Sequence, residues 1–182
     1  MKNFKEKAVV LTQEEIKKTL QRLTHQILET NPSLKELVLV GIQTRGVYLA
    51  KRIQAVLEEI GGVEIPLGVL DITLYRDDLT AIGINPLVKA TQIDFDLNDK
   101  MVILIDDVLF TGRTIRAALN ALMDFGRPTK VELLVLIDRC HLELPIRADF
   151  VGKNIPTAKD ETVEVRLEEV DAKDEVVVGE KG

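Results

Sequence analysis

Hydrophobic residues occur along the chain in two alternating patterns. Short continuous runs, typical of strands buried on both faces of a sheet, lie at residues 37–40, 101–105 and 131–137. Apolar residues three and four apart, typical of amphipathic helices, lie at residues 13–29, about 46–60 and about 111–123. This alternation predicts an α/β fold with a mainly parallel sheet.

Local signals define the helix ends. Thr12-Gln13-Glu14-Glu15 has the form of a capping box, in which threonine and glutamate satisfy free N–H groups at a helix start. The second helix should stop at Gly61-Gly62. The third should present one apolar face, formed by Ile115, Leu119, Leu122 and Met123.

The remaining segments give weaker patterns. Residues 63–74 suggest one or two strands with a bend near 66–68, and residues 75–85 suggest a loop or hairpin closed by Pro86. Three short strands are expected near residues 148–151, 162–165 and 176–178. Without a repeat or a linker-like tract, we expect residues 1–182 to form a single domain.

Composition adds limits on location and partners. The chain begins without a long apolar stretch and has one cysteine, Cys140, so we expect a reduced, cytoplasmic setting. The net charge of -6 argues against a general nucleic-acid binder. However, residues 160–182 carry nine acids and three bases, so of 30 acids and 24 bases the remainder holds 21 of each. A local basic face therefore remains possible.

The strongest chemical signal is Asp106-Asp107, directly after the apolar run 101–105. Ligands of parallel sheets bind beyond the carboxyl ends of the strands. Ionised carboxylates there can accept hydrogen bonds from a vicinal diol, and the helix start with Thr111, Gly112 and Thr114 suits a phosphate. This order of groups predicts a ribose 5-phosphate site.

This segment also allows two other interpretations. One is an acidic strand end followed by a Thr-Gly turn without a ligand. The other is a receiver domain, whose paired aspartates bind a metal. In receiver domains the pair usually lies near the chain start, whereas here it lies at 106 and precedes a phosphate cradle.

Residues 102–114 resemble the thirteen-residue motif for 5-phosphoribosyl-1-diphosphate (PRPP) of type I phosphoribosyltransferases. The resemblance implies that family's fold, a mainly parallel twisted sheet flanked by helices, with a small hood. Further segments are similar to the bifunctional pyrimidine regulators of that family: residues 39–46, 71–79, 126–128 and 144–157. The PRPP-binding residues implied are Thr44, Arg45, Asp106, Asp107, Val108, Leu109, Phe110, Thr111, Gly112, Arg113 and Thr114.

The resemblance implies the reaction of uracil with PRPP to give UMP and diphosphate. Asp106, Asp107, Arg76 and Asp77 would be catalytic, the last two on a closing loop. Mg²⁺ would enter through PRPP and diphosphate, without a direct protein ligand. Thr44-Arg45 falls in the family's diphosphate loop, which often has a non-proline cis peptide, and uracil would be read near Asp138 and Arg139.

The resemblance also implies UMP-dependent binding of a leader mRNA hairpin by a homo-oligomer, a dimer or larger. The matching RNA-binding positions are Arg22, His25, His141, Arg147 and Lys153. The sequence departs from the family pattern where Cys140 replaces a glycine, Leu142 an arginine and Gln21 a threonine. Two alternatives therefore remain, a uracil phosphoribosyltransferase with weakened or lost RNA binding and a regulator that binds PRPP or UMP without turnover.

Overall fold

The computed structural model describes residues 4–31, 33–75 and 90–181. Among them the helices are α1 (Gln13–Thr30), α2 (Arg45–Gly61), α4 (Arg113–Met123) and the short α5 (Glu168–Asp171). The strands are β1 (Phe4–Thr12), β2 (Leu37–Ile42), β3 (Leu67–Leu70), β4 (Met101–Leu109), β5 (Lys130–Asp138), β6 (Phe150–Asn154), β7 (Glu161–Arg166) and β8 (Glu175–Lys181).

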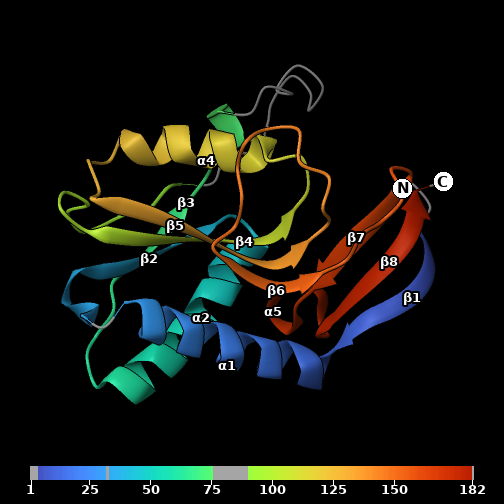
Figure 1. Cartoon of the computed structure of the whole chain (residues 1–182), viewed down its shortest axis with the longest axis horizontal. Coiled ribbons are helices and arrows are strands. Elements are labelled where there is room, and N and C mark those ends of the chain that lie inside the picture. The colour runs from blue at the N-terminus through green and yellow to red at the C-terminus, as the bar shows by residue number, and fades with distance from the viewer. Residues whose placement is uncertain (1–3, 32, 76–89, 182) are drawn as a thin grey trace.

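The centre of the molecule is a five-stranded sheet in the order β3-β2-β4-β5-β6. All its neighbouring strands pair in parallel. Helix α4 covers one face, and α1 and α2 cover the other (Figure 1). The predicted α/β fold with a mainly parallel sheet is confirmed.

A second, antiparallel sheet has the order β1-β8-β7. Figure 1 shows it beside the ends of β4 and β5, in the place expected for a hood. Its residues Leu11, Val163 and Val165 belong to the same apolar cluster as Ile16 of α1 and Leu136 of β5. The two sheets therefore share a core.

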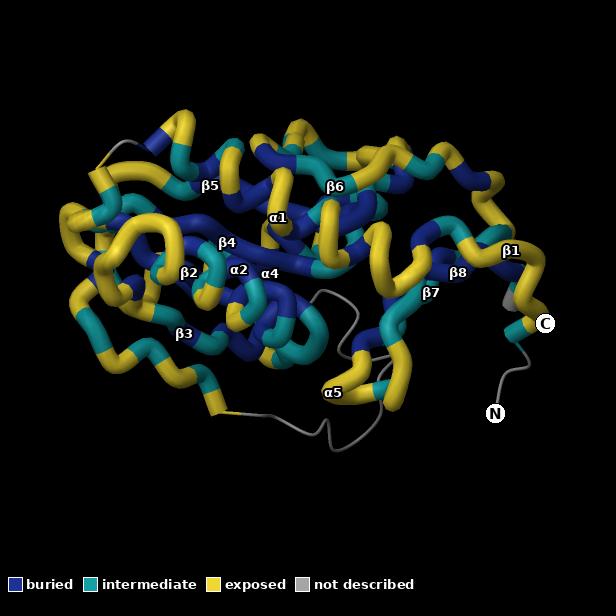
Figure 2. Tube along the Cα trace, turned by 90° about the horizontal axis from the view of Figure 1, so that it is seen from below, coloured by how far each residue is buried: buried dark blue, intermediate teal, exposed yellow. Residues whose placement is uncertain are grey.

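Burial follows the central sheet. Every residue of β2 is buried, and the tube of Figure 2 shows β2 and β4 as the buried middle of the molecule, with exposed residues along α1 on its outer side. Helix α1 faces the sheet with a stripe of large residues at helical spacing: Ile16, Leu20, Leu23 and Ile27. No helix in the described ranges is long and apolar enough to cross a membrane.

Several details of the elements match the expectations. The capping box is present, since the Glu15 N–H donates to Thr12 Oγ1 at 3.4 Å and the Thr12 N–H donates to the Glu15 carboxylate at 2.8 Å. Gly62 caps α2 at φ 62°. The predicted strands 37–40, 101–105 and 131–137 are all present and each is longer than expected.

Other details were wrong or missed. Met123 is 49% exposed, and the buried face of α4 is completed by alanines instead: Ala117, Ala118 and Ala121. The one or two strands expected in residues 63–74 are confirmed as a single short strand, β3, and the 3-10 helix Thr73–Tyr75 that follows was missed. Strand β1 was not foreseen, because its charged positions hide any alternation. Most of the expected loop 75–85 lies outside the described residues.

Candidate active site

A pocket of about 360 Å³ opens at the carboxyl ends of the neighbouring strands β3, β2 and β4. It lies where the rule for parallel sheets places a ligand. Its lining combines three carboxylates, one guanidinium and several hydroxyl or amide groups. The lining residues are Gln43, Thr44, Arg45, Asp71, Ile72, Thr73, Asp106, Asp107, Val108 and Thr114.

The chain enters the pocket from β2 through Gln43 and Thr44, whose peptide bond is cis, as the family resemblance implied. Arg45 follows as the first residue of α2. The next residue, Gly46, allows α2 to start directly against β4. A Cβ atom at Gly46 would lie 2.4 Å from the Ile105 carbonyl oxygen, which no side chain can tolerate. The close approach keeps Arg45 next to the aspartate pair.

The aspartate pair is the most electrostatically perturbed part of the pocket. Asp106 is only 6% exposed, and its Oδ1 accepts the N–H of Asp107 at 2.9 Å, while Asp107 Oδ1 accepts the N–H of Val108 at 2.9 Å. Burial, and then repulsion by the Asp107 carboxylate, raises the pKa of Asp106 well above its ordinary value. Burial also raises the pKa of Asp107, against the lowering effects of Asp106 and of the Arg45 charge.

This pair therefore favours a ligand that brings hydrogen-bond donors. The hydroxyls of a vicinal diol would donate to the carboxylate oxygens and lower the free energy of their ionised form. Opposite the pair, Thr114 lies in the first turn of α4, where unpaired N–H groups and the helix dipole favour an anion. Gly112, at φ 88°, forms the left-handed turn into this helix.

The structure separates the predicted PRPP motif into three parts. Asp106, Asp107, Val108 and Thr114 line the pocket. The side chain of Leu109 lies in the apolar core, and Arg113 is exposed and donates through Nε to Glu143 at 3.1 Å. A second pocket, of about 460 Å³, lies alongside and is lined by Phe110, Thr111, Cys140, His141, Leu142, Glu143 and Lys159.

Asp138 and Arg139, expected near the base, line neither of these two pockets. The guanidinium of Arg139 lies 3.8 Å from the ring centroid of Phe110, while its Nε donates to Thr157 Oγ1 at 3.0 Å and its Nη2 to the Glu161 carbonyl at 2.7 Å. The Asp138 carboxylate accepts the N–H of Cys140 at 2.7 Å. Both side chains thus shape the wall behind Phe110.

Cys140 has φ 60°, a conformation that favours glycine. Cys140 thus replaces the glycine of the family pattern at a position where the backbone has a positive φ. Burial, and then the charge of Asp138, raises the pKa of the Cys140 thiol, which disfavours the nucleophilic thiolate.

Asp71 and Thr73 line the pocket but were not assigned roles from the sequence. Asp71 is the first residue after β3, and its Oδ1 accepts the N–H of Thr73 at 2.8 Å and its hydroxyl at 2.6 Å. The strand-end rule that found Asp106 would have found Asp71 as well, had β3 been predicted to end at Leu70.

The positions expected to bind RNA fall into two places. Arg22 of α1 donates to the carbonyls of Val151 and Gly152 at 3.3 and 2.6 Å, and Lys153 of β6 donates to the Val10 carbonyl at 2.9 Å. His25, one helical turn from Arg22, is exposed. Arg147 is also exposed, before β6. In contrast, His141 lies against Phe110 and contacts the Thr157 carbonyl.

The two remaining expectations concern the closing loop and the metal ion. Arg76 and Asp77 lie outside the described residues. Among the residues in the described ranges, no group of three or more His, Cys, Asp or Glu side chains is arranged to hold a metal ion.

The comparisons with known proteins agree with this geometry. Residues 9–170 match the family model of the phosphoribosyl transferase domain. The chain is 56% identical over 175 residues to the bifunctional protein PyrR of Thermus aquaticus, with 96% of this chain and 97% of that protein covered. It is 54% identical over 178 residues to that of Caldicellulosiruptor bescii, with 98% and 96% covered.

Solved structures support the fold at greater distance. The hypoxanthine phosphoribosyltransferase of Trypanosoma cruzi superposes with a TM-score of 0.73 at 18% identity, covering 97% of this chain and 98% of the other. The corresponding enzyme of Staphylococcus aureus gives 0.69 at 21% identity, with 97% and 93% covered. At these identities the likeness shows the fold alone.

Proposed function

Since the chain belongs to the phosphoribosyltransferase family and, within it, to the bifunctional PyrR proteins, we propose that it combines an enzyme and a regulator in one domain. As an enzyme it converts uracil and PRPP to UMP and diphosphate. As a regulator it binds the leader mRNA of a pyrimidine operon when UMP is bound, and so controls transcription attenuation.

One observation carries the enzymatic part. The pocket brings together the aspartate pair of β4, Arg45 of α2 and Thr114 at the start of α4. These groups match, in one cavity, the ribose diol, the diphosphate and the 5-phosphate of PRPP. A simple acidic turn would not require the chain to bury Asp106 beside a second carboxylate.

The reaction follows from these positions. Asp106 and Asp107 accept hydrogen bonds from the ribose hydroxyls, and their negative charge stabilises the oxocarbenium-like sugar as diphosphate leaves. Thr44 and Arg45 bind the departing diphosphate, while the N–H groups of residues 111–114 hold the 5-phosphate. Arg76 and Asp77, whose segment is not described, are proposed to close over the sugar and exclude water.

Mg²⁺ is proposed to enter with PRPP and diphosphate, held by their oxygens without a direct protein ligand. The carboxylates of Asp71, Asp106 and Asp107 at the pocket would attract such a cation through their charge. Bound with PRPP, it would neutralise charge on the diphosphate leaving group.

Uracil is proposed to lie toward the second pocket, next to Phe110 and the backbone of residues 138–141. Arg139 stiffens this wall by stacking on Phe110, so the base would be read largely by backbone groups. UMP in this position also contacts the segment that carries His141 and Leu142, which offers a physical link from nucleotide to RNA binding.

The RNA surface is proposed to be the edge formed by α1 and β6, with Arg22, His25, Arg147 and Lys153. The carbonyl contacts of Arg22 and Lys153 leave part of each cation available to phosphate oxygens. Leu142 lacks the charge that the family has there, so we expect a weaker salt dependence of binding than an arginine would give. A nascent transcript as partner implies action in the cytoplasm, and we propose a homo-oligomer.

The test pairs two measurements on the same preparation. UMP formation from uracil and PRPP with Mg²⁺ is assayed beside a gel shift of the leader hairpin with and without UMP. We expect turnover and a UMP-dependent shift. Turnover without any shift at modest salt would favour the alternative of an enzyme that has lost RNA binding, and a preference for hypoxanthine or orotate would reject uracil as substrate.

A further inference from the structure

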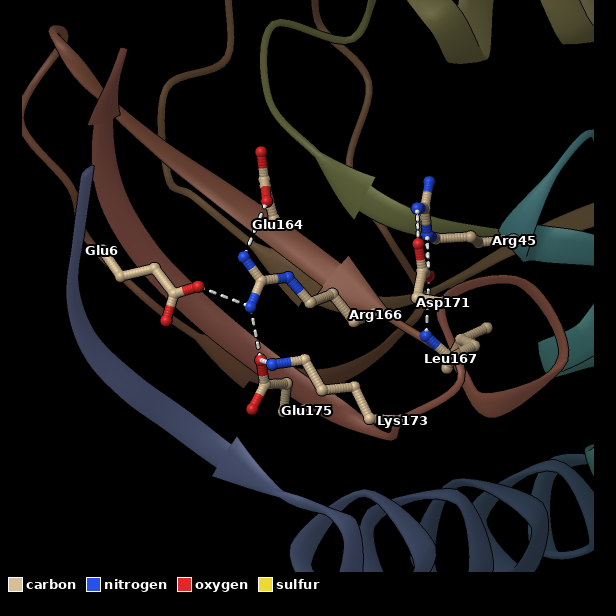
Figure 3. Close-up of polar contacts among 8 residues, drawn as sticks. All are labelled: Glu6, Arg45, Glu164, Arg166, Leu167, Asp171, Lys173 and Glu175. Atoms are coloured by element: carbon tan, nitrogen blue, oxygen red, sulfur yellow. Dashed lines mark hydrogen bonds and ion pairs between the residues drawn. The ribbon is translucent and has the colours of Figure 1, made fainter. Parts of the chain in front are cut away.

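The C-terminal acidic segment reaches the pocket through a single forked ion pair. Arg45 Nε donates to Asp171 Oδ2 at 3.1 Å, and Arg45 Nη2 donates to Asp171 Oδ1 at 2.7 Å (Figure 3). A forked pair fixes the plane of the guanidinium as well as its distance. The two residues are 126 positions apart in the sequence, so only the fold brings them together.

Asp171 is itself held in place. Its Oδ2 also accepts the N–H of Leu167 at 2.9 Å, and its own N–H donates to the Leu167 carbonyl at 2.7 Å. Leu167 is fully buried, which anchors the turn to the core. Burial opposes ionisation of Asp171, but the hydrogen bonds from Arg45 and Leu167 outweigh it and hold its pKa below the ordinary value.

The pair leaves one edge of the guanidinium available. Arg45 Nη1 has no hydrogen-bond partner among the described residues, and Figure 3 shows one terminal nitrogen of Arg45 directed away from Asp171. A guanidinium carries five N–H donors, so donors remain for a second anion. Arg45 also lines the pocket and lowers the pKa of Asp107, so its charge is felt there.

We propose that Asp171 is a positioning residue for Arg45, fixing the guanidinium so that its free edge meets the diphosphate of PRPP. An unrestrained arginine side chain loses rotamer entropy when it binds a ligand. The forked pair removes much of that freedom before the ligand arrives. This proposal rests on the proposed function, because it takes diphosphate as the ligand of Arg45.

The same segment supplies a matched control. Arg52 lies seven residues after Arg45 on α2 and forms a forked pair with Asp174, at 2.7 Å to Oδ2 and 2.8 Å to Oδ1. The Asp174 carboxylate also accepts a backbone N–H, that of Glu168, at 2.8 Å. Neither Arg52 nor Asp174 lines the active-site pocket. Asp174→Ala thus removes a forked carboxylate link between this segment and α2 without touching the site, while Arg52 keeps its other pair, with Glu169.

The test compares Asp171→Ala, Asp174→Ala, Arg45→Ala and the double variant Arg45→Ala/Asp171→Ala in the full chain. Calorimetry gives the dissociation constants of Mg²⁺-diphosphate and of UMP, and kinetics give kcat and KM for PRPP. We expect Asp171→Ala to weaken diphosphate binding about tenfold and to raise KM for PRPP similarly. UMP binding should change less than twofold, because UMP lacks the diphosphate.

Asp174→Ala should lower the melting temperature and leave diphosphate binding unchanged. In the Arg45→Ala background, the Asp171 substitution should add less than a twofold loss, since its effect acts through Arg45. The near-isosteric Asp171→Asn replaces Asp171→Ala if the latter does not fold, and Asp171→Glu should restore part of the affinity.

Unchanged diphosphate affinity in Asp171→Ala would overturn the proposal, and so would equal losses in Asp171→Ala and Asp174→Ala. Independent, additive losses from Arg45 and Asp171 would also overturn it, because they would show that Asp171 does not act through Arg45. Wild-type protein that binds diphosphate but forms no UMP would instead refute the proposed enzyme and leave the test of the ion pair valid.

Discussion

The charged groups of the three-stranded sheet and those of the strand-end pocket are arranged in opposite ways. On the sheet, Arg166 is surrounded by carboxylates, with Glu6 at 2.6 Å, Glu175 at 2.5 Å and Glu164 at 3.2 Å, and Lys173 adds a second cation 2.6 Å from Glu175 (Figure 3). Hydrogen bonds from Lys173, and then from Arg166, overcome partial burial and lower the pKa of Glu175.

In the pocket, the buried Asp106 lies beside the half-buried Asp107, and the pKa of each carboxyl is raised. The sheet satisfies its charges internally, whereas the pocket leaves charge and hydrogen-bonding capacity for a ligand. Perturbed carboxylates of this kind are a mark of functional sites, and networks like that of Arg166 are a mark of structural ones. Substitutions in the pocket should therefore mainly reduce activity, and substitutions in the charge network of the sheet should mainly reduce stability.

The largest effect is expected in the pocket. Asp107→Asn should lower kcat for UMP formation at least a hundredfold, because it removes a carboxylate charge beside the reacting sugar. The far-ultraviolet circular dichroism spectrum should be unchanged. Rates within a few fold of the wild type would show that Asp107 has no role in turnover.

Breaking the network on the sheet should have the converse result. Arg166→Met should lower the free energy of unfolding by about 2 kcal/mol, because it removes the one guanidinium that pairs with Glu6, Glu164 and the partly buried Glu175. Urea denaturation measures this loss, and kcat should stay near the wild-type value. The exposed ion pairs of Lys7 with Glu161 and Glu180 on the same sheet are the control, since Lys7→Met should lower the free energy of unfolding far less than Arg166→Met.

Relieving the buried charge should stabilise the unliganded protein. Asp106→Asn keeps the acceptor for the Asp107 N–H and removes a carboxylate whose pKa is raised in the folded state, so we expect a gain of about 1 kcal/mol at neutral pH together with loss of turnover.

The stability of the two proteins should also depend on pH in different ways. A raised folded-state pKa favours folding below the unfolded value, about 3.9, and that advantage is lost as pH rises through the folded-state pKa. The stability of Asp106→Asn should therefore fall less between pH 4 and pH 7 than that of the wild type. If the free energies of unfolding of the two proteins changed with pH in parallel, the buried carboxylate of Asp106 would not be the source of this destabilisation.

The smallest effect concerns backbone conformation. Cys140→Gly should stabilise the protein by about 0.5 to 1 kcal/mol in thermal denaturation, because glycine adopts φ 60° without steric strain. Ala172→Gly, at φ 59° after α5, is the control and should stabilise by a similar amount. Only the Cys140 variant should change KM for uracil, so equal uracil kinetics in both would remove residues 138–141 from the base site.

The sequence allowed the central sheet and the heart of the pocket to be predicted because their signals are local. The apolar run before Asp106 gives the strand, and the turn at Gly112 gives the helix start within seven residues. Asp71 was missed because β3 is short and its apolar residues continue into the 3-10 helix.

Long-range pairs could not be predicted in this way. Strand β1 forms only because β8, from the other end of the chain, pairs with it in antiparallel register from Phe4 with Lys181 to Thr12 with Glu175. Its charged residues Lys5, Glu6 and Lys7 give no strand signal by themselves. The Arg45–Asp171 pair could not be predicted either, because the two residues are 126 positions apart in the sequence.

The close approach of Gly46 to the Ile105 carbonyl implies that two parts of the site differ in how well they tolerate amino-acid substitution. Where α2 touches β4, backbone meets backbone, and even one added methyl group is excluded, so the backbone geometry on this side of the pocket is nearly fixed. The wall of the second pocket at residues 140–143 is instead made of side chains, and Cys140 and Leu142 in it already depart from the family pattern. New preferences for the base or for RNA can therefore arise by substitution in that wall while the phosphoribosyl platform stays the same.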